Sequence, residues 1–381
     1  MTLCKRIAAI ASLVLSMSVW AAEPEVGENA LTIGMSAPLS GPNGAYGIEM
    51  RQTIQAYFGQ INRTGGINGR KLNLVALDDG YETERTVANT KTLIKENNAF
   101  ALLSYYGSSP TTEAMNTVFG PARVPLIGTI SGANTLREPT SSNPNARYMF
   151  NVRASYADEA EVIVTQLVSL GLKNFAVFYQ NDGFGKSGLD GITAALKKHN
   201  LAPTAVGTVE RNSLDVSKAV EAIAKATPQA VIMVTLYKPT AAFVRAMKKI
   251  NQNPMFMTLS PVGTEQLIAE LGAESRGIAI SQVVPYPWND GVQVVREYQK
   301  LVGKSAAYSY YGLEAYLMAR TLVEGLKRTG KDLSREKLVN ALESMSNQDF
   351  GGYRINYSTT GRLGSRFVEL TVVGPEGKIL R

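Results

Sequence analysis

The feature that most constrains this chain is a regular alternation of short apolar runs with longer amphipathic stretches. A strand-like run at 31–37 is followed by a helical pattern at 50–64. The alternation continues with strands at 71–78, 99–106 and 124–129, and with helices at 84–97 and 111–122. Strands separated by helices in this way predict a parallel sheet that carries helices on both faces.

A second series of the same kind follows the first. Its strand-like runs lie at 149–155, 175–180, 204–210, 230–237, 255–260 and 277–284, and its helical stretches include 157–171 and 241–252. The chain therefore contains a second sheet of similar size. Ligands bind such sheets at the carboxyl ends of their strands, so we expect the functional site between the two lobes.

The last third of the chain contains too few predicted strands to form a third hydrophobic core. Helical stretches at 291–302, 311–329 and 334–345 precede only two extended segments, at 351–358 and 366–375. We therefore predict an α/β fold of two Rossmann-like, doubly wound lobes joined by three crossovers, near 153, 283 and 360. The predicted division is 30–153 plus 284–360 for lobe I, and 154–283 plus 361–381 for lobe II.

The N-terminus has the pattern of a secretory signal peptide. Lys5 and Arg6 precede an apolar run at 7–20, which is shorter than the about 20 residues that span a bilayer. Small residues then precede a cleavage site after Ala21. We predict that residues 1–21 are removed, and because Cys4 lies among them, the mature chain folds without disulfides.

Composition excludes several classes of function. The 39 basic and 32 acidic side chains are interspersed, and no basic run alternates with aromatic residues, so no nucleic acid partner is expected. One cysteine and one histidine leave too few ligands for a zinc site. His199 lies at the end of a predicted helix, where it suits a capping role, and no G-x-S-x-G motif supplies a nucleophile. We expect neither an enzyme nor a cofactor.

Three glycine-containing loops follow strands of the first series, at 40–47, 107–114 and 128–135. None matches the G-x-G-x-x-G pattern, so a dinucleotide site lacks sequence support. In the second loop, Ser108 or Ser109 precedes a helix, where free backbone N–H groups suit a carboxylate. An ordinary helix cap is the alternative interpretation of this loop.

Several segments of the chain match one family in their residues and their order. They are SAPLSGPNGAYG at 36–47, GGINGRKLNLVALDD at 65–79, the serine-rich loop, VPLIGT at 124–129 and QNDGFGKSG at 180–188. This arrangement resembles the type I periplasmic solute-binding proteins of the leucine/isoleucine/valine-binding family. The resemblance runs from about Leu31 to Lys378. It implies a periplasmic protein without catalytic activity that delivers a small ligand to an inner-membrane ABC permease.

The resemblance also implies a set of site residues. The family's carboxylate-binding serine corresponds to Ser108, and the hydroxyl of the next loop to Ser131. Aromatic positions correspond to Tyr46, Phe184 and Tyr237, and an acidic position corresponds to Asp158, with Tyr156 an equally good alignment. Tyr81, Tyr105, Tyr156, Tyr237 and Tyr308 add rings and hydroxyls that suit an aromatic or hydroxylated ligand.

One departure from the family concerns the ligand's amine. The acidic residue that neutralises the ammonium group in the family would fall at Val262. Burial of an ammonium without a carboxylate partner is costly, so an amino acid would need Asp158 or Glu265 instead. Two ligands stay open: a branched-chain or other amino acid, and an aromatic or keto carboxylate without an amine. An enzyme on the same scaffold, or the sensing module of a receptor, is the alternative class.

Overall fold

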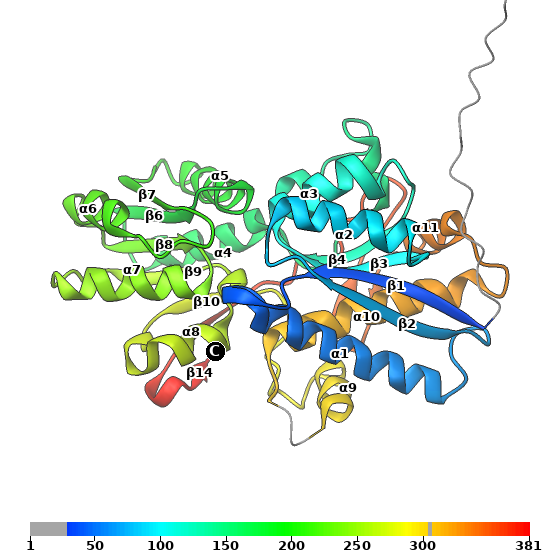
Figure 1. The fold of residues 1–381 in the computed structure, drawn as a ribbon. Coiled ribbons are helices and arrows are strands. Elements are labelled where there is room, and N and C mark those ends of the chain that lie inside the picture. The colour runs from blue at the N-terminus through cyan, green and yellow to red at the C-terminus, as the bar shows by residue number, and fades with distance from the viewer. Residues whose placement is uncertain (1–28, 304–306) are drawn as a thin grey trace, which may run out of the picture.

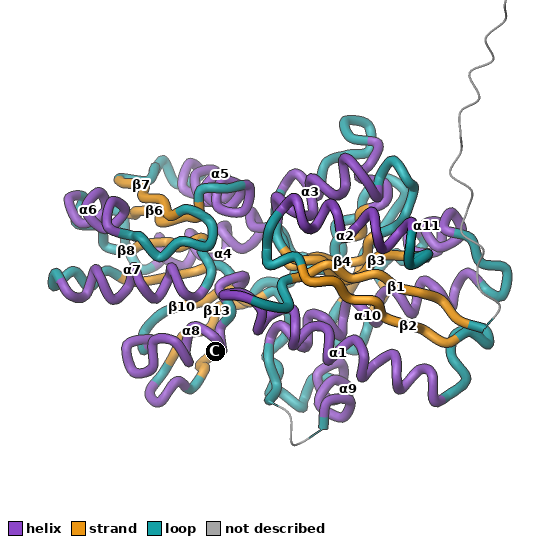
Figure 2. The backbone as a smooth tube through the Cα atoms, viewed as in Figure 1, coloured by secondary structure: helices purple, strands orange, loops and turns teal. Residues whose placement is uncertain are grey.

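A computed structural model describes residues 29–303 and 307–381, so the predicted signal peptide at 1–21 lies outside the described residues. Figure 1 shows two lobes side by side, each with a sheet between layers of helices, and Figure 2 shows the strands at the centre of both. The predicted fold class is confirmed. In the described part of the chain, no helix has the length and apolar character needed to cross a bilayer.

The first lobe is built on a fully parallel sheet with strand order β2-β1-β3-β4-β5. Its strands are β1 (Ala30–Ala37), β2 (Lys71–Asp78), β3 (Ala101–Tyr106), β4 (Leu126–Ile130) and β5 (Met149–Phe150). Its helices are α1 (Gly44–Arg63), α2 (Thr83–Lys95), α3 (Ser108–Ala114), α9 (Gln293–Val302), α10 (Tyr310–Thr329) and α11 (Arg335–Glu343). Helices α1 and α10 cover one face and α2 and α3 the other, which buries β3 and β4 completely (Figure 1).

The second lobe has a seven-stranded sheet in the order β14-β13-β10-β9-β8-β6-β7, in which only β13 runs antiparallel to the other strands. The strands are β6 (Phe175–Gln180), β7 (Ala205–Val209), β8 (Ala230–Val234), β9 (Met255–Thr258), β10 (Ala279–Gln282), β13 (Glu369–Val373) and β14 (Ile379–Leu380). The helices are α4 (Tyr156–Ser169), α5 (Gly183–Lys197), α6 (Ser217–Lys225), α7 (Tyr237–Lys249) and α8 (Thr264–Leu271). A separate small hairpin pairs β11 (Gln348–Asp349) with β12 (Arg354–Ile355).

The chain passes between the sheets three times, after β5, after β10 and after β12. One side chain ties these connections together. The Tyr353 hydroxyl lies 3.0 Å from the Val152 carbonyl oxygen and 3.2 Å from that of Val283. The backbone N–H of Ser365 also donates to Val152, at 3.1 Å. The predicted three-crossover hinge therefore forms one compact junction.

Most predicted elements differ from the observed ones by a few residues at their ends, and three of these differences have a clear local cause. The predicted strand at 149–155 is extended and paired only at Met149–Phe150, because the chain then leaves the sheet as the first crossover. Helix α1 begins at Gly44, six residues before the predicted start, because its first turn is rich in glycine and lacks the apolar spacing of a helix. Helix α7 begins at Tyr237 rather than 241, with Pro239 in its first turn, where proline is tolerated.

Candidate functional site

A stack of tyrosines from the first lobe reaches the backbone of the second lobe. Tyr46 in α1 stacks on Tyr106 at the end of β3, with ring centroids 5.5 Å apart, and on Tyr311 in α10, at 4.7 Å. The Tyr46 hydroxyl donates to the Val262 carbonyl at 2.7 Å, and the Tyr311 hydroxyl donates to the Pro261 carbonyl at 2.9 Å. All three rings are buried, so they form part of the surface on which the lobes meet.

A second group continues this contact at the carboxyl ends of β2 and β6. Tyr81 packs edge-on against Tyr106, at 5.3 Å, and its hydroxyl accepts a hydrogen bond of 3.0 Å from Gln180 in the other lobe. The Arg211 guanidinium lies 5.0 Å from the centre of the Tyr81 ring and pairs with Asp182 at 2.9 Å. These contacts place the carboxyl ends of both sheets opposite each other, as expected for a ligand site of this fold.

Buried hydroxyl groups gather beside the tyrosine stack. The Ser108 Oγ lies 2.8 Å from the Ser131 Oγ and 3.4 Å from the Tyr156 hydroxyl. The Tyr156 ring in turn contacts Phe184, at 5.3 Å between centroids. Because hydroxyl hydrogens rotate, these three groups can all turn toward one anionic oxygen. The structure thus brings together four residues predicted from the resemblance, namely Ser108, Ser131, Tyr156 and Phe184. We call Ser108, Ser131 and Tyr156 the hydroxyl cluster.

The other predicted residues have different surroundings. Ser109 accepts a hydrogen bond of 3.0 Å from the Gly183 N–H across the lobes. Tyr237 meets Tyr46 edge-on at 5.7 Å and donates to the Pro42 carbonyl at 2.9 Å. Val262 contributes its carbonyl oxygen to Tyr46, while its side chain packs in the apolar core of the second lobe.

The structure does not bring Tyr105 to the contact between the lobes, and its neighbour Tyr106 occupies that place. The Tyr105 hydroxyl lies 3.0 Å from the Thr90 Oγ1 of α2, behind the sheet. Regular alternation would put Tyr105 and Leu102 on opposite faces, yet Leu102 also lies on the α2 side. The cause is Ser104, whose φ of 55° interrupts the strand and reverses the facing of the residues after it.

Asp158 is also engaged elsewhere. Its carboxylate closes a capping box with Ser155 at the start of α4 and pairs with Arg366 at 2.9 Å. Burial opposes its charge, but the hydrogen bonds from Ser155 and Arg366 hold the pKa of Asp158 below its usual value. The other candidate acid, Glu265, accepts a hydrogen bond of 3.0 Å from the Tyr310 N–H at the edge of the lobe contact.

Sequence reasoning missed a cluster of buried charges at the first crossover. Arg153, with 1% of its surface exposed, lies 2.9 Å from a Glu159 oxygen and 3.6 Å from the Glu314 Oε1, and it also contacts the Ser260 hydroxyl. Burial opposes the charge of Arg153, but the two carboxylates hold its pKa above the ordinary value. The second Glu159 oxygen accepts from the Ser260 N–H at 2.8 Å and from the Ser281 hydroxyl at 2.6 Å.

Glu314 differs from Glu159 because nothing in the described part of the chain donates a hydrogen bond to it. Its Oε1 is buried without a donor, and only 5% of the residue is exposed. Burial raises the pKa of Glu314 to about 7, although the nearby Arg153 lowers it. A buried carboxylate without donors is costly, so it is suited to receive a donor from a ligand. Sequence reasoning missed Glu314 because the apolar periodicity of 308–319 indicates a helix of the hydrophobic core.

No group of three or more acidic, histidine or cysteine side chains in the described residues could hold a metal ion. Three features define the class of two-lobed solute-binding proteins. They are two α/β lobes built on largely parallel sheets, a hinge of three connections, and polar and aromatic groups where the lobes meet.

Comparison with known proteins agrees with this class. Residues 30–374 match the family model described as periplasmic binding protein, and the chain belongs to that family, in its type I, leucine/isoleucine/valine-binding group. It is 22% identical to a Leu/Ile/Val-binding protein homolog of Brucella melitensis, over 88% of this chain and 89% of that protein. It is 25% identical to an amino acid binding protein of Pseudomonas aeruginosa, over 74% and 75% of the two chains.

A solved structure shares the fold closely. A possible leucine/isoleucine/valine-binding protein of Rhodopirellula baltica superposes with a TM-score of 0.87 at 31% identity, covering 93% of this chain and 97% of that one.

Proposed function

We propose that this protein is the substrate-binding component of an ABC importer, that it works in the periplasm after removal of its signal peptide, and that it delivers a small carboxylate to an inner-membrane permease. The observation that carries the proposal is the hydroxyl cluster of Ser108, Ser131 and Tyr156, buried where the two lobes meet. The Pseudomonas aeruginosa relative is an amino acid binding protein and the Brucella melitensis relative is a Leu/Ile/Val-binding protein homolog, and the proposed role involves no catalysis.

Closure of the lobes supplies the binding energy in this proposal. We assign 30–153 plus 284–360 to lobe I and 154–283 plus 361–381 to lobe II. Ser108 and Ser131 come from lobe I, and Tyr156 and Phe184 come from lobe II. A carboxylate held by hydroxyls from both lobes bridges them, while the tyrosine stack excludes water from the polar contacts.

For the ligand itself, Glu314 favours an amino acid. Its donor-free carboxylate offers the ammonium partner that Val262 cannot supply. A branched-chain or other α-amino acid would then have its carboxylate at the hydroxyl cluster and its amine at Glu314. The second candidate is an aromatic or keto carboxylate without an amine, which the ring stack of Tyr46, Tyr106 and Tyr311 favours.

The test is a thermal-shift and calorimetric screen of the refolded, ligand-stripped mature protein. Amino acids, keto acids and benzoate-like acids form the panel, and a ligand at a hundred times its Kd adds about 2.7 kcal/mol of stability. Ser108→Ala should weaken the best ligand by about 1–3 kcal/mol, because it removes a hydrogen bond to a charged group. Ser142→Ala, which removes an exposed hydroxyl, is the control. Unchanged affinity in Ser108→Ala would remove the hydroxyl cluster from the site.

A further inference from the structure

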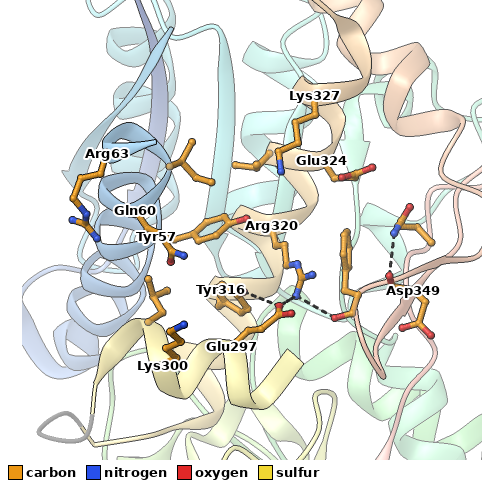
Figure 3. Close-up of a pocket in the computed structure, with 15 residues that line it drawn as sticks. Tyr57, Gln60, Arg63, Glu297, Lys300, Tyr316, Arg320, Glu324, Lys327 and Asp349 are labelled. Carbon is orange, nitrogen blue, oxygen red and sulfur yellow. Dashed lines mark hydrogen bonds and ion pairs between the residues drawn. The ribbon is translucent and has the colours of Figure 1, made fainter. Parts of the chain in front are cut away.

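A cavity of about 600 Å³ lies on the first lobe, away from the contact between the lobes. Its walls come from α1, α9, α10 and the segment that ends at Phe350 (Figure 3). The rings of Tyr57 and Tyr316 meet edge-on at 5.1 Å in this wall. The volume falls within the range of roughly 300–1,000 Å³ that is usual for small-molecule sites.

The acidic side chains of this cavity are already neutralised. Glu297 pairs with Arg320, whose guanidinium is also held 5.1 Å from the centre of the Phe350 ring. Glu324 pairs with Arg328 at 2.9 Å, from the neighbouring turn of the same helix. Asp349 faces Arg354 at 3.5 Å and accepts hydrogen bonds from two backbone N–H groups.

Three cations of the same cavity have no such partner. Arg63, Lys300 and Lys327 line it from α1, α9 and α10, and within 29–303 and 307–381 no acidic side chain pairs with any of them. In Figure 3, Lys327 and Lys300 enter from opposite sides of the tyrosine pair. Three uncompensated positive charges around one cavity raise its affinity for anions.

The neutral polar groups of the wall suit the same ligand. Tyr57 is almost fully buried, and its hydroxyl has no hydrogen-bond partner within the described ranges. Burial raises the pKa of Tyr57 to about 12, so this hydroxyl stays protonated and can donate. The Gln60 side chain, one turn further along α1, adds an amide that can donate as well.

We propose that the cavity bounded by Tyr57, Arg63, Lys300 and Lys327 is a second binding site, for a small molecule that carries two or more carboxylate or phosphate groups. Cations from three different helices can each meet a separate anionic group, and Tyr57 donates to one of them. The proposal does not depend on the ligand bound between the lobes, because no residue of the hydroxyl cluster lines this cavity.

The experiment is titration calorimetry of the mature protein with citrate and with inorganic phosphate, at low salt and with the best ligand of the screen above present or absent. Lys300→Ala/Lys327→Ala should weaken citrate binding at least about tenfold, because each lysine supplies a charge-assisted hydrogen bond. Lys197→Ala/Lys249→Ala removes two exposed charges from the second lobe and should leave the affinity within about twofold, since charges beyond a Debye length are screened. Tyr57→Phe keeps the ring and should weaken binding several-fold.

Each of the following results would overturn the proposal, except persistence of citrate binding in Ser108→Ala, which supports it. The first is absence of citrate and phosphate binding to the unmodified protein. The second is an equal weakening of citrate binding by the two double variants, which would indicate that binding depends only on the net charge of the protein. The third is binding to vesicles of phosphatidylglycerol without binding to citrate, which would assign the cations to a membrane surface. Citrate binding that persists in Ser108→Ala supports the site. Loss of citrate binding in that variant, or displacement of citrate by the best ligand of the screen, would place citrate between the lobes and contradict the proposal.

Discussion

At the scale of single residues, the uneven surroundings of the two buried glutamates lead to a prediction about the ligand. Glu159 accepts hydrogen bonds at both oxygens, whereas Glu314 accepts none from the described residues. Glu314→Gln should therefore lower the affinity for leucine by about tenfold or more, because a charge-assisted hydrogen bond is worth about 1.5–3 kcal/mol. The affinity for the matching keto acid, which lacks the amine, should not fall.

Calorimetry with leucine and its keto acid measures this difference directly. Glu161→Gln, on the exposed face of α4, is the matched control because it also removes one carboxylate charge. An equal loss for both ligands would mean that Glu314 acts on the structure of the site rather than on the amine.

The limits of sequence reasoning are visible at this same scale. The place of Ser108 and Ser131 at the edge of the sheet could be predicted, because Ser131 directly follows β4 and only Gly107 separates Ser108 from β3. Tyr106 could not be distinguished from Tyr105, because the choice depends on the backbone of Ser104, whose φ of 55° has no sequence signature. Glu314 could not be predicted either, because the absence of hydrogen-bond donors around its carboxylate depends on the folded surroundings and not on the spacing of residues in the sequence.

At the scale of elements, the start of α1 depends on a close approach that only glycine permits. A Cβ on Gly47 would overlap the backbone carbonyl of Pro38, whereas a Cβ on Gly59 of the same helix would meet only the end of the Arg63 side chain, at 3.6 Å. Gly47→Ala should therefore destabilise the protein by about 1–3 kcal/mol. Gly59→Ala should stabilise it by roughly 0.5–1 kcal/mol, because alanine favours the helix.

Urea unfolding of the two variants tests this prediction. The two substitutions are chemically identical and lie in one helix, so helix propensity alone would give them the same sign. Stabilisation by both would show that the contact between α1 and the loop after β1 is loose.

The order and type of the elements could be predicted from hydrophobic periodicity, because buried parallel strands are continuous apolar runs and covering helices are amphipathic. Strands β2 and β6 begin and end at the predicted residues. Helix starts were less accurate, since the first turns of α1 and α7 contain glycine and proline, which indicate loops as strongly as helix starts.

At the scale of the whole molecule, two carboxylates from opposite lobes meet where the lobes touch. Glu49 of α1 accepts a hydrogen bond from Gln266 of α8 at 3.4 Å, next to Glu265. Burial, followed by the Glu265 charge, raises the pKa of Glu49 to about 8, and burial raises that of Glu265 to about 7. Both values lie above the ordinary value of 4.5, so the folded protein binds more protons than the unfolded chain between these limits.

Stability from this pair is therefore complete below pH 4.5 and is lost as the pH rises through 7 to 8. We expect the melting temperature to fall between pH 5.5 and 8.5, and to fall less steeply in Glu49→Gln. Thermal melts across this range, with Glu96→Gln as an exposed control in lobe I, provide the measurement. The same slope in Glu49→Gln and in the unmodified protein would be incompatible with this account.

The strand order of the second sheet also has a consequence for biosynthesis. Strand β13 pairs with β10 and comes from the end of the chain, after the chain has passed through the other lobe. Until β13 arrives, β10 is an open edge with unpaired backbone groups, which invites pairing between molecules. The second lobe thus cannot mature as an independent unit during synthesis, and the interval before β13 docks is when a newly made molecule is most prone to aggregate.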